Sequence, residues 1–340
     1  MNPLTLKNAH FAPLFRDEGL ADVFSTEQIS ASFLAFEIAL SEALGAEAGV
    51  LERMRSFEPD LGKLEPSIIL NGVSVPEYVA QLRAHVGEGP VHSGATSQDV
   101  IDTAMMIAVR DANEVVAERL SEVVARLDDL EARFGTDPMM GRTRMQAAIV
   151  ISVGDRLDAW RGPLAEALEA LGHLRPLLER VQLGGSVGTG FRDQPGIRTQ
   201  IAEALGLHPA HAAWHSTRGA LMDYGSWLSR VSGSLGKLGL DLGLMAQQGV
   251  EEVAFQGGGA SSAMPHKQNP VLAEVLVSFA RYNAAQLAAL HSAQVHEQER
   301  SGAAWTLESM VLPAMIMTTG RGLALAADLL GQVERLGRAR

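Results

Sequence analysis

The sequence contains no cysteine. Disulfide bonds, a thiolate nucleophile and a cysteine-ligated metal are therefore excluded, and we expect a cytoplasmic location. Aromatic residues are also scarce, at 5%, whereas alanine, leucine and valine are abundant. This composition favours helices over sheets, so we expect an all-α protein.

Positive charge is in short supply as well. The formal net charge is −12, which argues against nucleic-acid binding through a broad basic face. Met1 to Phe15 hold no long apolar run, and no stretch of about 18 uncharged apolar residues follows. We therefore expect neither a signal peptide nor a membrane span. A protein of this charge that binds an anion must gather its few cations in the site.

The chain divides by its pattern into two parts. Residues 1–101 mix proline, glycine and short helical stretches, and we expect a mainly helical N-terminal domain. One helix there is predicted from Ser25 to about Gly49, with Phe33, Phe36 and Leu40 on one face. Residues 102–340 are predicted to form a bundle of long helices that serves as an oligomerisation core and carries residues 257–270. Apolar residues recur at helical spacing in five segments: 102–134, 149–180, 218–252, 271 onwards and 305–336.

Two features of these segments bear on packing. Gly162-Pro163 predicts a kink in the second, and residues 183–190 form a glycine-rich loop after it. The third holds four glycines on one stripe, which predicts close approach to another helix; a weakened, bent helix is the alternative. Those glycines are Gly233, Gly236, Gly239 and Gly243. Apolar faces this long need neighbours, so we expect an oligomer.

Residues 257–270, here called the signature segment, read Gly-Gly-Gly-Ala-Ser-Ser-Ala-Met-Pro-His-Lys-Gln-Asn-Pro. Glycines let a segment open and close over a substrate, and a helix start attracts negative charge. Lys267 adds a positive charge, and Asn269 can both donate and accept hydrogen bonds. The segment therefore predicts a loop that closes over a small anion and moves a proton. The alternative is a glycine-rich surface loop followed by a helix cap.

The signature segment resembles the signature loop of the fumarase/aspartase superfamily, G-S-S-x-M-P-x-K-x-N-P. Ala260 stands where that pattern has glycine, and Ser261 to Pro270 match throughout. The resemblance implies that Ser261 is the catalytic serine. A serine hydroxyl is a weak base, so Lys267 would have to stabilise its alkoxide. Ser262 stays open as an alternative proton carrier.

Residues 92–99, His-Ser-Gly-Ala-Thr-Ser-Gln-Asp, resemble the H-x-G-A-T-S-Q-D block of the adenylosuccinate lyase and carboxymuconate cycloisomerase branch. Thr96 and Ser97 are short hydroxyl donors ahead of a helix start, which suits a substrate carboxylate. His92 can hold an anion or transfer a proton near neutral pH. Thr96, Ser97 and Asp99 also suit helix capping, and the two roles do not exclude each other.

Residues 141–148, Gly-Arg-Thr-Arg-Met-Gln-Ala-Ala, resemble the superfamily pattern G-R-T-H-x-Q-x-A. Gln146 matches, but Arg144 replaces the histidine that belongs to the acid–base machinery at the leaving group. Arginine is a poor general acid, which argues against expelling an amine or hydroxide. A carboxylate, with a pKa of about 4, leaves without protonation, and an arginine can grip it with two hydrogen bonds. The alternative is a structural ion pair for Arg144.

Two further blocks resemble the 3-carboxy-cis,cis-muconate cycloisomerases. Residues 214–218, Trp-His-Ser-Thr-Arg, match W-H-x-x-R, and residues 296–300, His-Glu-Gln-Glu-Arg, with Gly302 and Trp305, match H-E-x-E-R…G…W. His215 and Arg218 lie three residues apart and are predicted to share one face at a helix start, where they can clamp a carboxylate. A solvated helix face is the alternative reading.

The resemblance implies a cycloisomerase acting on a small polycarboxylate. We expect it to lactonise 3-carboxy-cis,cis-muconate to a carboxymuconolactone in protocatechuate breakdown. It also implies a long five-helix bundle of the fumarase/aspartase superfamily, packed into a homotetramer with sites built from three subunits. Family members commonly continue into a further small helical domain. Here the predicted fifth helix reaches almost to Arg340, so we expect no full C-terminal domain in this sequence. No metal or organic cofactor is implied, and no histidine spacing of the H-E-x-x-H kind is present.

Three alternatives stay open at this point. The substrate substituent can be 3-sulfo rather than 3-carboxy. The chemistry can be an adenylosuccinate-lyase-like β-elimination, against which the arginine at 144 argues. The chain can also be a non-catalytic helical protein, although it keeps Ser261, Lys267 and Asn269.

Overall fold

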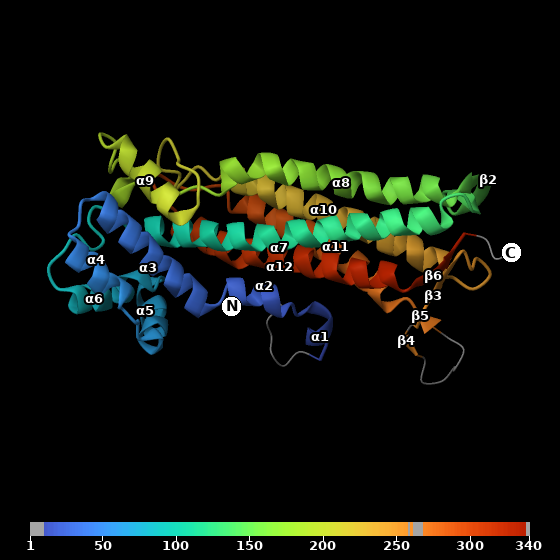
Figure 1. Ribbon diagram of the computed structural model, residues 1–340, viewed down its shortest axis with the longest axis horizontal. Coiled ribbons are helices and arrows are strands. Elements are labelled where there is room, and N and C mark those ends of the chain that lie inside the picture. The colour runs from blue at the N-terminus through green and yellow to red at the C-terminus, as the bar shows by residue number, and fades with distance from the viewer. Residues whose placement is uncertain (1–9, 258, 261–267, 338–340) are drawn as a thin grey trace.

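The computed structural model describes residues 10–257, 259–260 and 268–337. Five long helices lie side by side and give the molecule an elongated shape (Figure 1). They are α7 (Ser97–Phe134), α8 (Val153–Leu178), α10 (Gly219–Met245), α11 (Val271–Ser292) and α12 (Gly302–Gly331). The predicted all-α bundle of five long helices is confirmed. The remaining regular structure in the described chain is short helices and three two-stranded pairs.

Short helices form the N-terminal part, which packs against one end of the bundle (Figure 1). The predicted helix from Ser25 to Gly49 is wrong in its extent: it is two helices broken at Gly45, whose φ is +80°. Ser25 does cap the first of them by accepting a hydrogen bond from the backbone N–H of Gln28. The helices are α1 (Ala12–Phe15), α2 (Glu18–Val23), α3 (Thr26–Ala43), α4 (Ala48–Arg55), α5 (Leu64–Asn71) and α6 (Val75–Val86), with a 3-10 turn at Leu61–Lys63.

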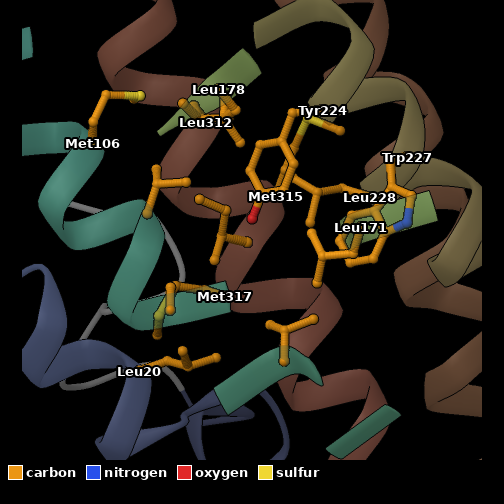
Figure 2. Packing of buried hydrophobic residues seen from close by; sticks show 14 of the residues in the cluster. Leu20, Met106, Leu171, Leu178, Tyr224, Trp227, Leu228, Leu312, Met315 and Met317 are labelled. Atoms are coloured by element: carbon orange, nitrogen blue, oxygen red, sulfur yellow. The ribbon is translucent and has the colours of Figure 1, made fainter. Parts of the chain in front are cut away.

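The bundle core is made of large apolar side chains from all the long helices. Tyr224 and Trp227 of α10 stack with centroids 5.7 Å apart, and Met315 of α12 and Leu171 of α8 lie close by (Figure 2). Trp227 also donates a hydrogen bond from its indole N–H to the carbonyl of Ala167. These contacts bury the apolar stripes that the sequence repeats predicted.

Glycines let α10 lie unusually close to α11. A Cβ added at Gly236 would stand 2.5 Å from the Cβ of Ala280, and one added at Gly239 would stand 2.6 Å from the carbonyl oxygen of Ala273. The predicted close approach is therefore confirmed for these two residues. Gly233 and Gly243 have no neighbouring atom within 4 Å of such a Cβ.

The predicted start of the second long helix at Ile149 is wrong. Gln146–Ser152 is instead a strand, β2, which pairs antiparallel with β1 (Pro138–Thr143). Helix α8 begins only at Val153, where Ser152 and Asp155 cap it reciprocally, and it continues through Pro163. The third helix ends earlier than predicted, at Met245, and residues 246–252 are turns and irregular chain. The fifth ends at Gly331 because Val333–Leu336 is a strand. Two further short strand pairs are present. Those pairs are β3 (Val253–Phe255) with β6 (Val333–Leu336), and β4 (Gly259–Ala260) with β5 (Gln268–Asn269).

Among the described residues, one helix, α12, is long and apolar enough by composition to cross a membrane, with a mean hydropathy of 1.4. Some 78% of that stretch is buried inside the protein, so it is the central core helix of the bundle. Helix α7 runs without interruption through the predicted domain boundary at residue 101. The division into two domains stays a prediction.

Candidate active site

The candidate site residues fall into two groups at opposite ends of α7. This helix has 38 residues, so at 1.5 Å per residue it is about 57 Å long. His92, Thr96, Ser97, His215 and Arg218 lie around its N-terminus. Arg144 and Gln146 lie in the β1–β2 hairpin beyond its C-terminus, and Asn269 lies at the same end of the bundle (Figure 1). One chain therefore does not bring the two groups together.

At the N-terminus of α7, Thr96 and Ser97 are half-buried. The predicted capping is present, because Asp99 Oδ2 accepts a hydrogen bond from the backbone N–H of Thr96 at 3.0 Å. Arg300, from the loop before α12, donates to the Thr96 hydroxyl at 2.6 Å and to the carbonyl of Ser186 at 2.5 Å. A helix N-terminus with two hydroxyls and an arginine favours an anion.

Beneath this surface Asp99 is fully buried and has four donors. Its oxygens accept from the backbone N–H groups of Gly184 and Gly185, both at 2.9 Å, and from Nε2 of His215 at 2.7 Å, besides the bond from Thr96. His215 is itself buried, and its Nδ1 has no hydrogen-bond partner in the described structure. His215 therefore supports the start of α7 from below.

Arg218 is held by two buried carboxylates. It donates to Asp102 at 2.9 Å and 3.2 Å and to Glu308 at 2.8 Å, and its guanidinium lies 4.7 Å over the ring of Trp214. Burial alone would lower the pKa of Arg218, but the two acids outweigh it and raise the pKa. Burial also raises the pKa of Glu308, against the opposing effect of Arg218. The expected helical face is wrong, because α10 begins at Gly219, after both His215 and Arg218.

Two groups near this end are absent from the sequence-based site. Glu37 of α3 is fully buried and bonds His92 through both the backbone N–H and Nδ1. The sequence does hint at Glu37, because it is an acid within the apolar helix face of Phe33, Phe36 and Leu40. His296 has both ring nitrogens shielded from solvent and without a partner in the described structure. Burial, and next Arg218, lower the pKa of His296 below its ordinary value.

Arg144 lies at the tip of the β1–β2 hairpin. Arg144 and Met145 form its two-residue turn with φ of +49° and +68°, a left-handed conformation that neither side chain favours. Both residues, like Gln146, are exposed. Arg144 has no hydrogen bond or ion pair within the described chain, so the ion-pair alternative has no support there. Strain at an exposed arginine points to a functional constraint.

A cavity of about 430 Å³ lies beside this turn and is rich in cations. Two of the cationic side chains form ion pairs, Arg142 with Glu252 and Lys237 with Asp241. Within the described chain Arg156 makes a single side-chain hydrogen bond, to the sulfur of Met245 at 3.9 Å. The cationic lining residues are Arg142, Arg144, Arg156 and Lys237. Because two arginines are not neutralised, the cavity favours an anion such as a carboxylate.

Ser261, Ser262 and Lys267 lie outside the described residues. Asn269 pairs with Gly259, and both residues lie within the signature segment. Asn269 lines a cavity of about 590 Å³ together with Phe255, Gln332 and Arg335. In the described part of the chain no three His, Asp or Glu side chains are grouped to hold a metal ion.

The fold is that of a mainly helical lyase, and the hydroxyl and cationic groups at its two ends suit an anionic substrate. A family model described as "Lyase" matches residues 66–282, and the chain belongs to this family. It is similar to the 3-carboxy-cis,cis-muconate cycloisomerases of Pseudomonas aeruginosa (32% identity, 96% of this chain, 76% of the relative) and Acinetobacter baylyi (29% identity, 95% of this chain, 77% of the relative). It also superposes on the 3-carboxy-cis,cis-muconate lactonizing enzyme of Pseudomonas putida (TM-score 0.87, 29% identity, 96% of this chain, 77% of that chain).

Proposed function

We propose that the protein is a cycloisomerase that closes 3-carboxy-cis,cis-muconate to a carboxymuconolactone. The observation that carries the proposal is Arg144, which has no partner among the described residues and lies at the tip of a strained turn beside a cationic cavity. Lyases that expel an amine or hydroxide need an acid at the leaving group, and a guanidinium that stays protonated is a poor one. A reaction whose nucleophile or leaving group is a carboxylate needs no such acid. Similarity to relatives with this activity over nearly the whole chain supports the same conclusion.

The reaction is an intramolecular addition. One carboxylate oxygen of the substrate bonds to a carbon of a C=C bond, and the π electrons move to the adjacent carbon. Negative charge then spreads onto the neighbouring carboxylate as an aci-carboxylate, until that carbon takes up a proton from Ser261. Lys267 and Asn269 would stabilise this charge, and holding the substrate folded supplies much of the acceleration. In the reverse direction Ser261 would remove the proton.

Different groups of the protein would bind the different carboxylates of the substrate. Thr96, Ser97 and His92 would bind one of them at the N-terminus of α7, with Arg300 beside them. Arg144 and Gln146 would bind the carboxylate that enters or leaves the ring. Arg218 and His215 would act from beneath, because their acid partners lie within the chain.

The separation of the two groups by about 57 Å requires more than one chain at each site, since α7 has 38 residues between them. We infer a homotetramer in which the α7 N-terminus of one chain meets the hairpin of a second and the signature segment of a third. The hairpin carries exposed apolar residues that such an assembly would cover: Met145 is 71% exposed and Ile149 is 72% exposed. This enzyme would work in the cytoplasm, in the breakdown of aromatic compounds, without a metal or an organic cofactor.

The test is an ultraviolet assay with 3-carboxy-cis,cis-muconate, because lactone closure destroys the conjugated diene. We expect loss of absorbance that persists in EDTA, is abolished by Ser261→Ala and is kept by Ser121→Ala, which removes an exposed hydroxyl on α7. If folded protein leaves the absorbance unchanged, the proposal fails. Turnover of the 3-sulfo analogue or of adenylosuccinate would then identify the alternative, and binding of a tricarboxylate without turnover would indicate a non-catalytic protein.

A further inference from the structure

Glu37 is a fully buried carboxylate whose hydrogen bonds in the described structure both go to His92. It lies on α3 between apolar residues of the core, and its Oε2 accepts the backbone N–H of His92 at 2.8 Å. Its Oε1 lies 2.6 Å from Nδ1 of the same histidine. Burying a carboxylate costs free energy unless it is paired, and both oxygens of Glu37 are paired with His92. The role of Glu37 therefore depends on the role of His92.

These two bonds hold His92 in a conformation that the chain does not favour by itself. His92 has a φ of +55°, in the left-handed region. The loop that follows is also fixed, since a Cβ at Gly94 would stand 2.7 Å from the ring of Phe191. The histidine backbone and ring are thus both positioned at the entrance to α7.

The contact with Glu37 decides which nitrogen of His92 is free. The short bond places a proton between Nδ1 and the carboxylate, which leaves Nε2 as the nitrogen that can meet a ligand. Within the described chain Nε2 makes no hydrogen bond, and the His92 side chain is 14% exposed. Four residues later the chain reaches the Thr96 hydroxyl and the approach of Arg300.

We propose that Glu37 is the positioning residue for this anion site, acting through His92; the proposal rests on the proposed function. Glu37 occupies Nδ1 and fixes the ring plane of His92, so that Nε2 faces the carboxylate bound at the start of α7. In the complex the imidazole lies between two carboxylates, that of Glu37 and that of the substrate. In this arrangement Nδ1–H is donated to Glu37 and Nε2–H to the substrate.

A purely architectural Glu37 would merely fasten α3 to the loop before α7. Glu37→Gln distinguishes the two roles, because glutamine keeps the shape and can still accept one of the two N–H groups but carries no charge. Glu42→Gln, an exposed change on the same helix, is the matched control.

The experiment measures KM and kcat for 3-carboxy-cis,cis-muconate and, by calorimetry, the Kd for propane-1,2,3-tricarboxylate. We expect Glu37→Gln, compared with wild type at a temperature at which both are folded, to raise KM and Kd about ten-fold or more, because it weakens a hydrogen bond to a charged group. The double variant Glu37→Gln/His92→Gln should bind no worse than His92→Gln alone, since Glu37 acts through that ring.

Unchanged KM and Kd in Glu37→Gln, or multiplicative losses in the double variant, would overturn the positioning role. Wild-type protein that binds the tricarboxylate but does not lactonise the muconate would reject the proposed function, while the titrations still decide the role of Glu37. Wild-type protein that does neither overturns both.

Discussion

Asp99 accepts a 2.7 Å hydrogen bond from Nε2 of His215, which lies 116 residues further along the chain. The same carboxylate bonds two backbone N–H groups of the loop at Gly184 and Gly185. One buried side chain thus joins the start of α7, the loop after α8 and the segment before α10. Thr96 and Ser97, at the start of α7, are held in place by this junction.

Replacing Asp99 with asparagine should destabilise the protein strongly. Asparagine has one acceptor oxygen in place of two, and its NH₂ group would face donors. Leaving a buried donor without its acceptor costs about 1–3 kcal/mol, and we expect a loss of at least this size in the free energy of unfolding by urea. Asp22→Asn, an exposed change on α2, should leave it unchanged. Equal midpoints for the two variants would show that the junction carries little stability.

The stability of the protein should fall in mild acid through His296. Burial, and then Arg218, lower its pKa in the native state, while Asp102 and Glu297 act in the opposite direction. The unfolded chain, with a histidine pKa of about 6.5, therefore takes up the proton first. The stabilisation is present above about pH 6.5 and is lost as the pH falls from there through the lowered native pKa.

Urea unfolding at pH 7.5 and pH 5.5 checks this expectation. His296→Gln should lose less stability than the wild type between the two values, whereas His291→Gln, an exposed histidine of α11, should behave as the wild type does. Parallel pH profiles for wild type and His296→Gln would contradict the account.

The turn at Arg144 and Met145 should trade stability against activity. A non-glycine residue in the left-handed region costs about 1–2 kcal/mol, so Arg144→Gly and Met145→Gly should each raise the melting temperature. Arg144→Gly should also lower kcat/KM by about 10- to 100-fold, because it removes a charged hydrogen-bond donor. Met145→Gly should lose far less. Equal activity losses in the two variants would remove Arg144 from the site.

Mixed oligomers should recover activity from two inactive parents. Thr96→Ala and Arg144→Ala affect opposite ends of the chain, so a site built from different chains can receive an intact residue from each parent. Random mixing by co-refolding should restore about a quarter of the sites. Thr96→Ala mixed with Ser97→Ala should restore none, because one chain supplies both residues. A monomer by light scattering, or recovery in neither mixture, would refute the shared site.

The long helices could be predicted from the sequence because their apolar periodicity extends over many turns. The hairpin could not. Its run Ile149-Val150-Ile151 is short and apolar, and such a run fits a strand or the start of a helix equally well. The break at Gly45 was hidden for a related reason, since an isolated glycine in a helical pattern is often tolerated.

The motifs pointed to candidate site residues but not to the buried groups that support them. Thr96 and Arg144 could be named because each stands in a dense local pattern. Glu37 and Asp102 could not, because their partners lie 55 and 116 residues away and are fixed only by tertiary packing. Nor does the sequence reveal that Arg218 forms ion pairs with Asp102 and Glu308 of its own chain.

The left-handed turn at residue 144 bears on how such enzymes diverge. Histidine is among the non-glycine residues that adopt positive φ more readily than most, and the superfamily pattern places histidine here. Arginine and histidine can therefore exchange at the hairpin tip while the backbone stays as it is. Under the proposed role of residue 144, such an exchange changes the side chain that meets the leaving group, and the bundle beneath is left intact.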